Sequence, residues 1–373
     1  MHFRGPIQLK QFAVYMPGSP SAKAKRDAHV RRHAHAHAGH MHHARAPEPQ
    51  AGAIVTATIN GEVVSWTNEY TGMSSTAAPG APAAASSAPA ANDDAAAPAS
   101  SSQSSEPSSS SAAPAAASAS SAGGSISSSS GGWGRQAYYN SASGSQGLVF
   151  LNHNGGSGSG VFDYTFGNSL SYASADGTEG SANPTTLSDT TLPSEAEVVI
   201  MSDNECSGDD CGYTRNGTVA YHGFDGPAKA FFFEFQMPQV GGTAANQWDP
   251  VNMPAVWMLN AQIPRTLQYG NASCSCWTSG CGELDLFEVL APGDTRMKST
   301  LHGNIGGGDS DYIDRPCDAT QKYAVILYNN NVHIKVLDAD TDFGEEMDSG
   351  TLNDICGSTL EQTNTVSLFN LAS

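Results

Sequence analysis

The chain has 373 residues and a formal net charge of −19, but eight of its 17 Lys and Arg residues lie in the first fifty positions. The remainder therefore carries nine bases against 34 acids, a balance of −25. A body this acidic repels nucleic acid and anionic membrane surfaces and suits neutral or cationic partners, so we expect no nucleic-acid partner and no membrane span.

Residues 1–50 are basic and rich in His, and we interpret them as a targeting segment or pro-segment. Their one apolar run, Phe12 to Met16, is too short for a secretory signal and far too short to cross a bilayer. Lys25-Arg26 and Arg31-Arg32 resemble dibasic processing sites of the secretory pathway. The clustered His residues could bind a transition metal, but a disordered pro-segment is the favoured interpretation.

Two short segments precede the main body. Residues 51–73 alternate like two strands around Asn60-Gly61, which predicts a β-hairpin. Residues 74–132 consist almost wholly of Ser, Ala, Pro and Gly and cannot bury enough apolar surface to fold, so they predict a disordered linker. We therefore expect residues 133–373 to fold and act without residues 1–132, as one domain and as a monomer.

The body contains many short apolar runs separated by Gly, Asn, Asp and Pro clusters. Residues 323–328 and 332–336 form the clearest pair, with a turn at Asn329 to Asn331 and period-two alternation in the second arm. No segment shows a sustained apolar stripe of helical period. This pattern predicts an all-β, antiparallel sandwich or jelly roll.

All seven cysteines lie in the body, close to two glycosylation sequons at Asn216 and Asn271. Together they indicate a secreted protein with disulfides in an oxidising compartment. We expect Cys206 to pair with Cys211, Cys317 with Cys356, and Cys281 with either Cys274 or Cys276. A metal site among Cys274, Cys276 and Cys281 lacks a clear fourth ligand, so we expect no metal and no cofactor.

The stretch Glu283-Leu284-Asp285-Leu286-Phe287-Glu288 carries the clearest chemical signal. Glu283 and Asp285 share one face of a strand, and Glu288 joins them only if a β-bulge near Leu286-Phe287 adds one residue. The Cα atoms of the two Glu then lie about 13 Å apart at ~3.3 Å per residue. Long Glu side chains on a concave sheet could approach the ~5–5.5 Å between the two carboxyls of a retaining glycosidase.

Two other interpretations of these acids remain open. A solvent-facing acidic strand edge would need no active site, although like charges on one face repel each other. A calcium or magnesium site would need more oxygen ligands than these three residues supply.

The same stretch resembles the E-x-D-x-x-E motif of glycoside hydrolase family 16, the laminarinase-like enzymes. Residues 230–238, 254–259 and 299–303 follow that family's order of strands. The Cys-rich residues 274–283 and the segment 166–173 resemble the Tos-type glycosyl hydrolases of fungal cell walls. The resemblance covers residues 133–373 and implies a concanavalin-like β-sandwich, or jelly roll, in a secreted cell-wall protein.

The resemblance also implies an activity, that of a retaining endo-β-1,3-glucanase that remodels the wall, with transglycosylation as a related outcome. Glu283 would be the nucleophile, Glu288 the acid/base and Asp285 an assisting residue. Trp257 and Trp277 could stack on glucose rings, and His302 could face the cleft, although each could equally pack in the core. The alternative is a non-catalytic glucan-binding wall protein. The Cys-rich segment before Glu283 departs from ordinary laminarinases.

Overall fold

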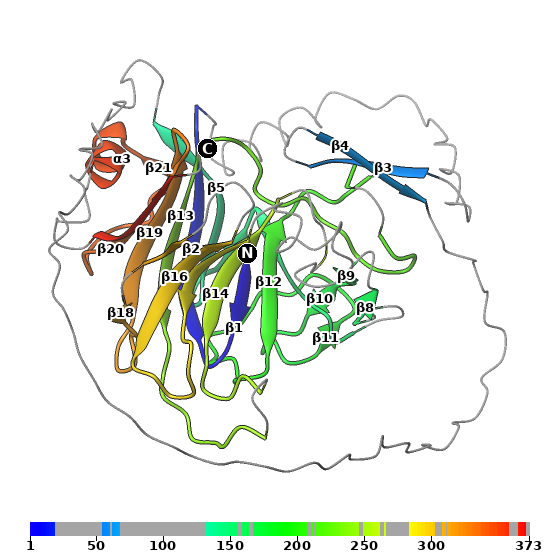
Figure 1. Ribbon diagram of the computed structural model, residues 1–373, viewed down its shortest axis with the longest axis horizontal. Coiled ribbons are helices and arrows are strands. Elements are labelled where there is room, and N and C mark those ends of the chain that lie inside the picture. Colours follow the sequence, from blue (N-terminus) through cyan, green and yellow to red (C-terminus); the bar gives the residue numbers. More distant parts are fainter. Residues whose placement is uncertain are drawn as a thin grey trace, which may run out of the picture.

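The computed structural model contains two antiparallel β-sheets packed face to face (Figure 1). It describes residues 1–18, 54–59, 62–67, 132–155, 159–160, 162–163, 167–207, 210–211, 214–245, 249–261, 265, 283–302, 308–310, 312–357 and 365–370. The all-β sandwich expected from the sequence is confirmed.

The larger sheet has ten strands. Its spatial order is β11 (Gly180–Ser181), β10 (Ser171–Ala173), β7 (Leu148–Asn152), β12 (Glu197–Ser202), β1 (His2–Arg4), β14 (Ala255–Leu259), β15 (Glu283–Glu288), β16 (Arg296–His302) and β17 (Gly308–Asp309), with β18 (Ile313–Asp314) also paired to β16.

The smaller sheet has eight strands and carries the α-helix of the described residues. Its order is β21 (Glu346–Met347), β5 (Trp133–Asn140), β2 (Gln8–Pro17), β13 (Lys229–Gln236), β19 (Gln321–Tyr328), β20 (Asn331–Leu337) and β22 (Thr365–Asn370), with β6 (Gly144–Gln146) on β5. Helix α3 (Ser349–Cys356) begins at the N-cap Asp348, whose carboxylate accepts a hydrogen bond from the Thr351 backbone N–H.

The core between the sheets is aromatic, and β13 shows how the sequence produces it. Phe231, Phe233 and Phe235 face the space between the two sheets, whereas Ala230 and Phe232 face a second apolar cluster that includes the buried side of α3. The smaller sheet is therefore apolar on both faces. This explains why its central strands read as continuous apolar runs rather than as alternating ones.

The predicted hairpin of β19 and β20 is confirmed. Tyr328 pairs with Asn331, and the two residues between them, Asn329 and Asn330, have φ values of 50° and 58°. Asn tolerates the left-handed region better than most residues, which suits it to a two-residue turn between twisted strands.

The first seventeen residues differ most from expectation, since they are not a segment separate from the body. Strand β1 lies between β12 and β14 in the larger sheet, and β2 lies between β5 and β13 in the smaller one (Figure 1, dark blue). The run Phe12 to Met16, interpreted as part of a pro-segment, is a central strand. Its Phe12 and Val14 face the intersheet core, and its Ala13 and Tyr15 face the second cluster.

The chain passes from one sheet to the other at Gly5, where no side chain fits. A Cβ built there would lie 2.1 Å from the carbonyl oxygen of Pro193, and the Gly5 N–H donates to the Ala196 carbonyl at 3.1 Å. The passage from β1 to β2 is thus packed directly against the strand connection before β12.

Two small sheets complete the described residues. Strand β3 (Ile54–Ile59) pairs with β4 (Glu62–Thr67) around the Asn60-Gly61 position of the expected hairpin, and β8 (Phe162–Asp163) pairs with β9 (Gly167–Asn168). The expected linker at 74–132 lies outside the described residues. In the part of the chain that is described, no helix is long and apolar enough to cross a membrane.

Candidate active site

The β-bulge expected in the acidic strand is confirmed by the pairing of β15 on both sides. Against β16, Glu283 lies opposite His302, Asp285 opposite Thr300 and Glu288 opposite Lys298. Three steps along β15, from Asp285 to Glu288, thus match two steps along β16, and the register against β14 shifts at the same place. The extra residue returns Glu288 to the face that carries Glu283 and Asp285.

Apolar packing anchors the other side of the strand. Leu284, Leu286, Phe287 and Val289 all belong to the intersheet core. The Phe287 ring lies 4.5 Å from the Tyr323 ring and 5.3 Å from the Phe235 ring, centroid to centroid. The bulge lets two successive residues point inward, and their burial keeps the three acids on the opposite face.

A buried hydroxyl group makes a hydrogen bond to the bulged part of the β15 backbone. The Ser299 Oγ donates a hydrogen bond to the Leu286 carbonyl at 2.6 Å, and the Ser299 N–H donates to Ser310 Oγ at 2.9 Å. Ser299 is fully buried. A bulge leaves ladder groups unpaired, and an unpaired buried carbonyl is costly, so this hydroxyl supports the bulged backbone.

The acids sit in a partly desolvated environment that favours protonated carboxyl groups. Glu283 and Asp285 are buried, with 6% and 8% exposure. Burial, and then the neighbouring charges of Glu288 and Glu283, raise the pKa of Asp285 to about 8. Burial also raises the pKa of Glu288, whereas the Arg4 guanidinium lowers it. Proton-holding carboxyls of this kind suit a general acid.

His302 lies at hydrogen-bond distance from the middle acid. Its Nε2 is 3.0 Å from Asp285 Oδ2, and the His302 side chain keeps 29% of its surface exposed. A proton shared between the two groups fixes the orientation of the Asp285 carboxyl. His302 therefore lies on the carboxylate face, where the sequence left its position open.

Strand β1 adds two charged or titratable residues to this face, which the sequence analysis missed. The Arg4 Nη2 lies 4.0 Å from Glu288 Oε1, and the Arg4 Nε donates to the Met253 carbonyl at 3.1 Å. The His2 Nδ1 lies 2.9 Å from Glu197 Oε1. No local signal in residues 1–17 points to these roles, because the partners lie about 190–290 positions away.

Trp257 lies next to Asp285 in the ladder and is nearly fully buried, at 3% exposure. The His2 ring stacks on it with centroids 5.0 Å apart, and the Arg4 guanidinium lies 5.7 Å from its ring centroid. The indole Nε1 has no hydrogen-bond partner among the described residues. The Trp257 ring is therefore buried beside the acids, in contact with His2 and Arg4. Any role in sugar binding stays a prediction.

The remaining predicted residues fall into three groups. Cys206 and Cys211 form the expected disulfide, and Asn216 is exposed in a turn. The expected Cys317–Cys356 pair is wrong: both thiols are free, because Cys317 lies beside Gln239 whereas Cys356 packs at the end of α3 against the second apolar cluster. Trp277, Cys281 and Asn271 lie outside the described residues.

Comparison with known proteins identifies the family of this chain. Residues 131–355 match the family model described as "Cell wall protein YJL171C/Tos1, C-terminal". The chain belongs to this family of cell wall proteins. Family membership agrees with the Tos-type resemblance expected from the sequence, while the relation to glycoside hydrolase family 16 stays a prediction.

Two curated relatives match most of this chain. The chain is 43% identical to "Probable circularly permuted 1,3-beta-glucanase TOS1" of Saccharomyces cerevisiae over 92% of this chain and 77% of that protein. It is 38% identical to a protein of Arthroderma benhamiae named as a probable circularly permuted 1,3-beta-glucanase, over 96% of this chain and 79% of the relative.

A third relative matches a shorter part. The chain is 52% identical to the Candida albicans protein of the same TOS1 name over 59% of this chain, and the match covers about half, 49%, of that protein. No solved structure matches the chain.

Proposed function

We propose that this protein is a retaining endo-β-1,3-glucanase of the fungal cell wall and that it cleaves glucan on the carboxylate face of β15. The observation that carries the proposal is the bulged strand, which brings Glu283, Asp285 and Glu288 to one partly desolvated face. The names of the curated relatives support the same substrate class. The Cys206–Cys211 disulfide and membership of a family of cell wall proteins support secretion to the wall as part of the proposal.

The proposed reaction has two steps. The Glu283 carboxylate attacks the anomeric carbon and forms a covalent glycosyl–enzyme bond, while Glu288 gives its proton to the departing glycosidic oxygen. Glu288 then takes a proton from water, and that water oxygen displaces Glu283 from the anomeric carbon. A sugar hydroxyl in place of water gives transglycosylation by the same steps.

The environment of each acid supports its role. Glu288 needs a proton for the first step, and burial raises its pKa while Arg4 limits the increase. Asp285 lies between the two Glu residues, and its raised pKa and its contact with His302 keep it from adding a third full negative charge. The four-residue spacing from Lys298 to His302 on β16 puts the Cα atoms of the two Glu about 13 Å apart at ~3.3 Å per residue.

The decisive experiment is incubation of the protein with laminarin, a β-1,3-glucan, followed by proton NMR of the first reducing ends. A retaining enzyme releases the β-anomer before mutarotation, and we expect that result. The α-anomer first would mean inversion and would remove Glu283 as nucleophile. Binding of laminarin without any cleavage or transfer, at any pH between 4 and 8, would instead favour the non-catalytic wall protein.

A further inference from the structure

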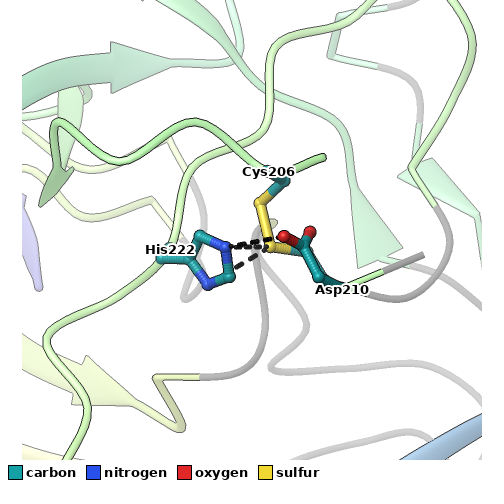
Figure 2. A group of neighbouring side chains, drawn as sticks. Cys206, Asp210 and His222 are labelled. Carbon is teal, nitrogen blue, oxygen red and sulfur yellow. Dashed lines mark hydrogen bonds and ion pairs between the residues drawn. A yellow bond between two sulfur atoms is a disulfide. The ribbon is translucent and has the colours of Figure 1, made fainter. Parts of the chain in front are cut away.

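Away from the carboxylates, four donor groups converge in the loop after β12. The group contains Cys206, Asp210, Cys211 and His222, and their ligand atoms all lie within 4.8 Å of one another (Figure 2). In the structure the two sulfurs are joined as a disulfide. Two thiolates, an imidazole and a carboxylate are also the donor types of a tetrahedral zinc site.

Two of the distances between donor atoms lie in the range of a tetrahedral zinc site. In a tetrahedral complex with bonds of about 2.0–2.3 Å, neighbouring ligand atoms lie roughly 3.3–3.8 Å apart. The Cys211 Sγ lies 3.6 Å from both ring nitrogens of His222, and His222 Nε2 lies 3.3 Å from Asp210 Oδ2. The two sulfurs are closer than that range, because the covalent bond holds them at 2.04 Å. Reduction removes that restraint.

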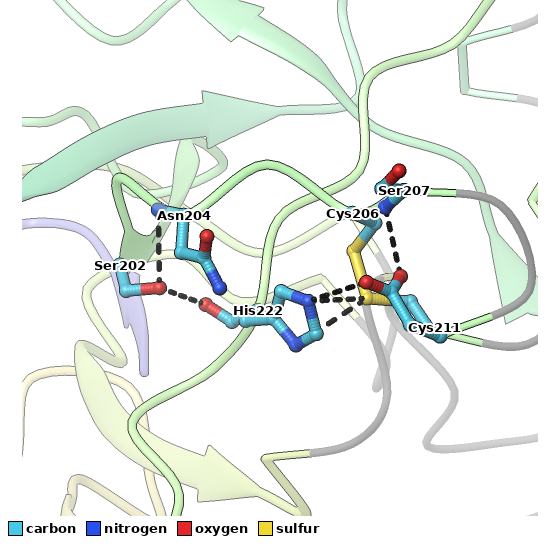
Figure 3. Close-up of polar contacts among 7 residues, drawn as sticks. Ser202, Asn204, Cys206, Ser207, Cys211 and His222 are labelled. Atoms are coloured by element: carbon cyan, nitrogen blue, oxygen red, sulfur yellow. Dashed lines mark hydrogen bonds and ion pairs between the residues drawn. A yellow bond between two sulfur atoms is a disulfide. The ribbon is translucent and has the colours of Figure 1, made fainter. Parts of the chain in front are cut away.

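Hydrogen bonds, in addition to the disulfide, position three of the four groups. The Cys206 N–H donates to the Ala220 carbonyl at 3.0 Å, and the His222 N–H donates to the Asn204 carbonyl at 2.9 Å. The His222 carbonyl in turn accepts from the Ser202 hydroxyl at 2.7 Å (Figure 3). Asp210 is oriented by the Ser207 N–H, which donates to its Oδ1 at 2.8 Å and leaves Oδ2 toward the histidine.

Solvent reaches the cluster from one side. The side chains of His222 and Asp210 are 32% and 44% exposed, whereas Cys211 is buried. A cation can therefore approach from solvent past His222 and Asp210 and reach the buried sulfur of Cys211. The segment lies over the face of the larger sheet that carries the acids, because Tyr221 packs on Val199 and Leu151, and Val199 is the ladder partner of His2.

We propose that this loop has two alternative states, a disulfide and a divalent-metal site, and that the reduced loop binds one zinc-class cation through Cys206, Cys211, His222 and Asp210. A dithiol reductant breaks the Cys206–Cys211 bond and becomes a disulfide itself, which leaves two protein thiols. The cation then binds both sulfurs and displaces their two protons. Binding therefore strengthens as pH rises, and reoxidation of the sulfurs by a disulfide, which is itself reduced to two thiols, restores the Cys206–Cys211 bond and expels the cation.

The test uses the full chain and cobalt(II) as a spectroscopic probe for zinc. Protein reduced under native conditions is freed of reductant without oxygen and titrated with Co²⁺, alongside oxidised protein. We expect sulfur-to-cobalt charge-transfer absorption and intense visible bands of tetrahedral cobalt in the reduced protein only. Equal spectra from oxidised and reduced protein would overturn the proposal, because the disulfide would then make no difference.

Variants separate this cluster from the other five cysteines. The Cys206→Ser/Cys211→Ser variant should lose the cobalt bands after reduction, and bands that persist there would place the metal elsewhere. His222→Ala keeps both thiols and should weaken Co²⁺ binding at least about tenfold. His333→Gln, on β20 of the other sheet, is the matched control and should bind like the wild type. Unchanged affinity in reduced His222→Ala would contradict the donor set.

Discussion

Glu288 reaches the carboxylate face only because the backbone of β15 carries an extra residue, and several neighbours hold that residue in place. Phe287 fills the core behind it, the Ser299 hydroxyl binds the Leu286 carbonyl, and Arg4 approaches the Glu288 carboxyl from β1. The properties of this one side chain therefore depend on its own strand, on the next strand β16 and on β1, which is distant in sequence.

Replacing either outer acid by its amide should abolish catalysis while the fold persists. Glu283→Gln and Glu288→Gln should each lower kcat/KM on laminarin at least about a thousandfold, because one removes the nucleophile and the other the proton donor. Glu346→Gln, at an exposed position of β21, is the control and should retain full activity. Near-normal turnover in either active-site variant would exclude that residue from the mechanism.

Arg4 should set the alkaline limit of activity. The guanidinium lowers the pKa of Glu288, so Arg4→Gln should raise that pKa and move the alkaline limb of kcat/KM to higher pH. Arg4→Lys keeps the positive charge and should leave the limb close to that of the wild type. A purely structural role would give Arg4→Gln lower activity at every pH with no displacement of the limb.

Ser299 should matter more than a hydroxyl near the surface. Ser299→Ala leaves the Leu286 carbonyl without its hydrogen bond, and we expect a loss of about 1–3 kcal/mol in unfolding free energy together with lower kcat. Denaturant titration and laminarin assays measure the two effects. Ser145→Ala, which removes a hydroxyl contact with Thr186 near the surface, should change neither by much. Similar behaviour of the two variants would mean that the bulge does not need the Ser299 hydroxyl.

At the scale of elements, the sequence predicted features that depend on neighbouring residues and missed the pairing of strands that are distant in sequence. The β15 bulge follows from one requirement, that Glu283, Asp285 and Glu288 share a face, and the β19–β20 hairpin follows from alternation around an Asn turn. Strands β1 and β2 have no such signal. The run in β2 is apolar on both faces because both faces are buried, and the expected low-complexity linker separates β1 and β2 from their partners.

Strands β1 and β2 should be indispensable for folding, contrary to the expectation that residues 1–132 can be removed. Phe3, Ile7, Leu9, Phe12 and Val14 are all buried, and at about 1.5–3 kcal/mol each their burial contributes roughly 10 kcal/mol. That equals the whole stability of many domains. A chain lacking residues 1–17 should therefore show no cooperative unfolding transition.

A milder change at the same place gives a graded test. Gly5→Ala should destabilise the fold by several kcal/mol, because the new methyl group meets the Pro193 carbonyl and cannot avoid it without moving backbone. Gly18→Ala is a control in open space, where only the positive φ of 63° opposes the change. Thermal unfolding compares the two variants, and equal effects would contradict the tight packing at Gly5.

For the whole molecule, the buried acids of the carboxylate face should lower the unfolding free energy as pH rises. The pKa of Asp285 is raised from 3.8 to about 8, so the folded state holds this proton more strongly than the unfolded state does. The unfolding free energy then falls between about pH 4 and pH 8, because the unfolded carboxyl releases its proton over that range while the folded one keeps it. Asp285→Asn should reduce this decline, part of which remains because the pKa of Glu288 is also raised, and should be more stable than the wild type at pH 8, by on the order of 1–3 kcal/mol.

The control is Asp189, whose pKa shift has the opposite sign to that of Asp285. Lys10 lowers the pKa of the Asp189 carboxyl, so that pair contributes its small stabilisation at high pH and loses it in acid. Asp189→Asn should therefore leave the decline between pH 4 and pH 8 in place. Parallel pH–stability curves for wild type and Asp285→Asn would show that this carboxyl is not desolvated in the folded protein.

The insertion of β1 between β12 and β14 also has a consequence for synthesis on the ribosome. His2 pairs with Val199 and Trp257, so β1 must wait until residue 257 has emerged before both its edges are covered. At about 5–20 residues per second that interval is on the order of 10–50 s. Strand β2, which contains the apolar run Phe12 to Met16, can pair with β5 once residue 140 has emerged, but it lacks β13 until residue 236 has emerged. This order of strands delays the closure of both sheets until much of the chain has been made, and it leaves apolar strand edges unpaired in the meantime.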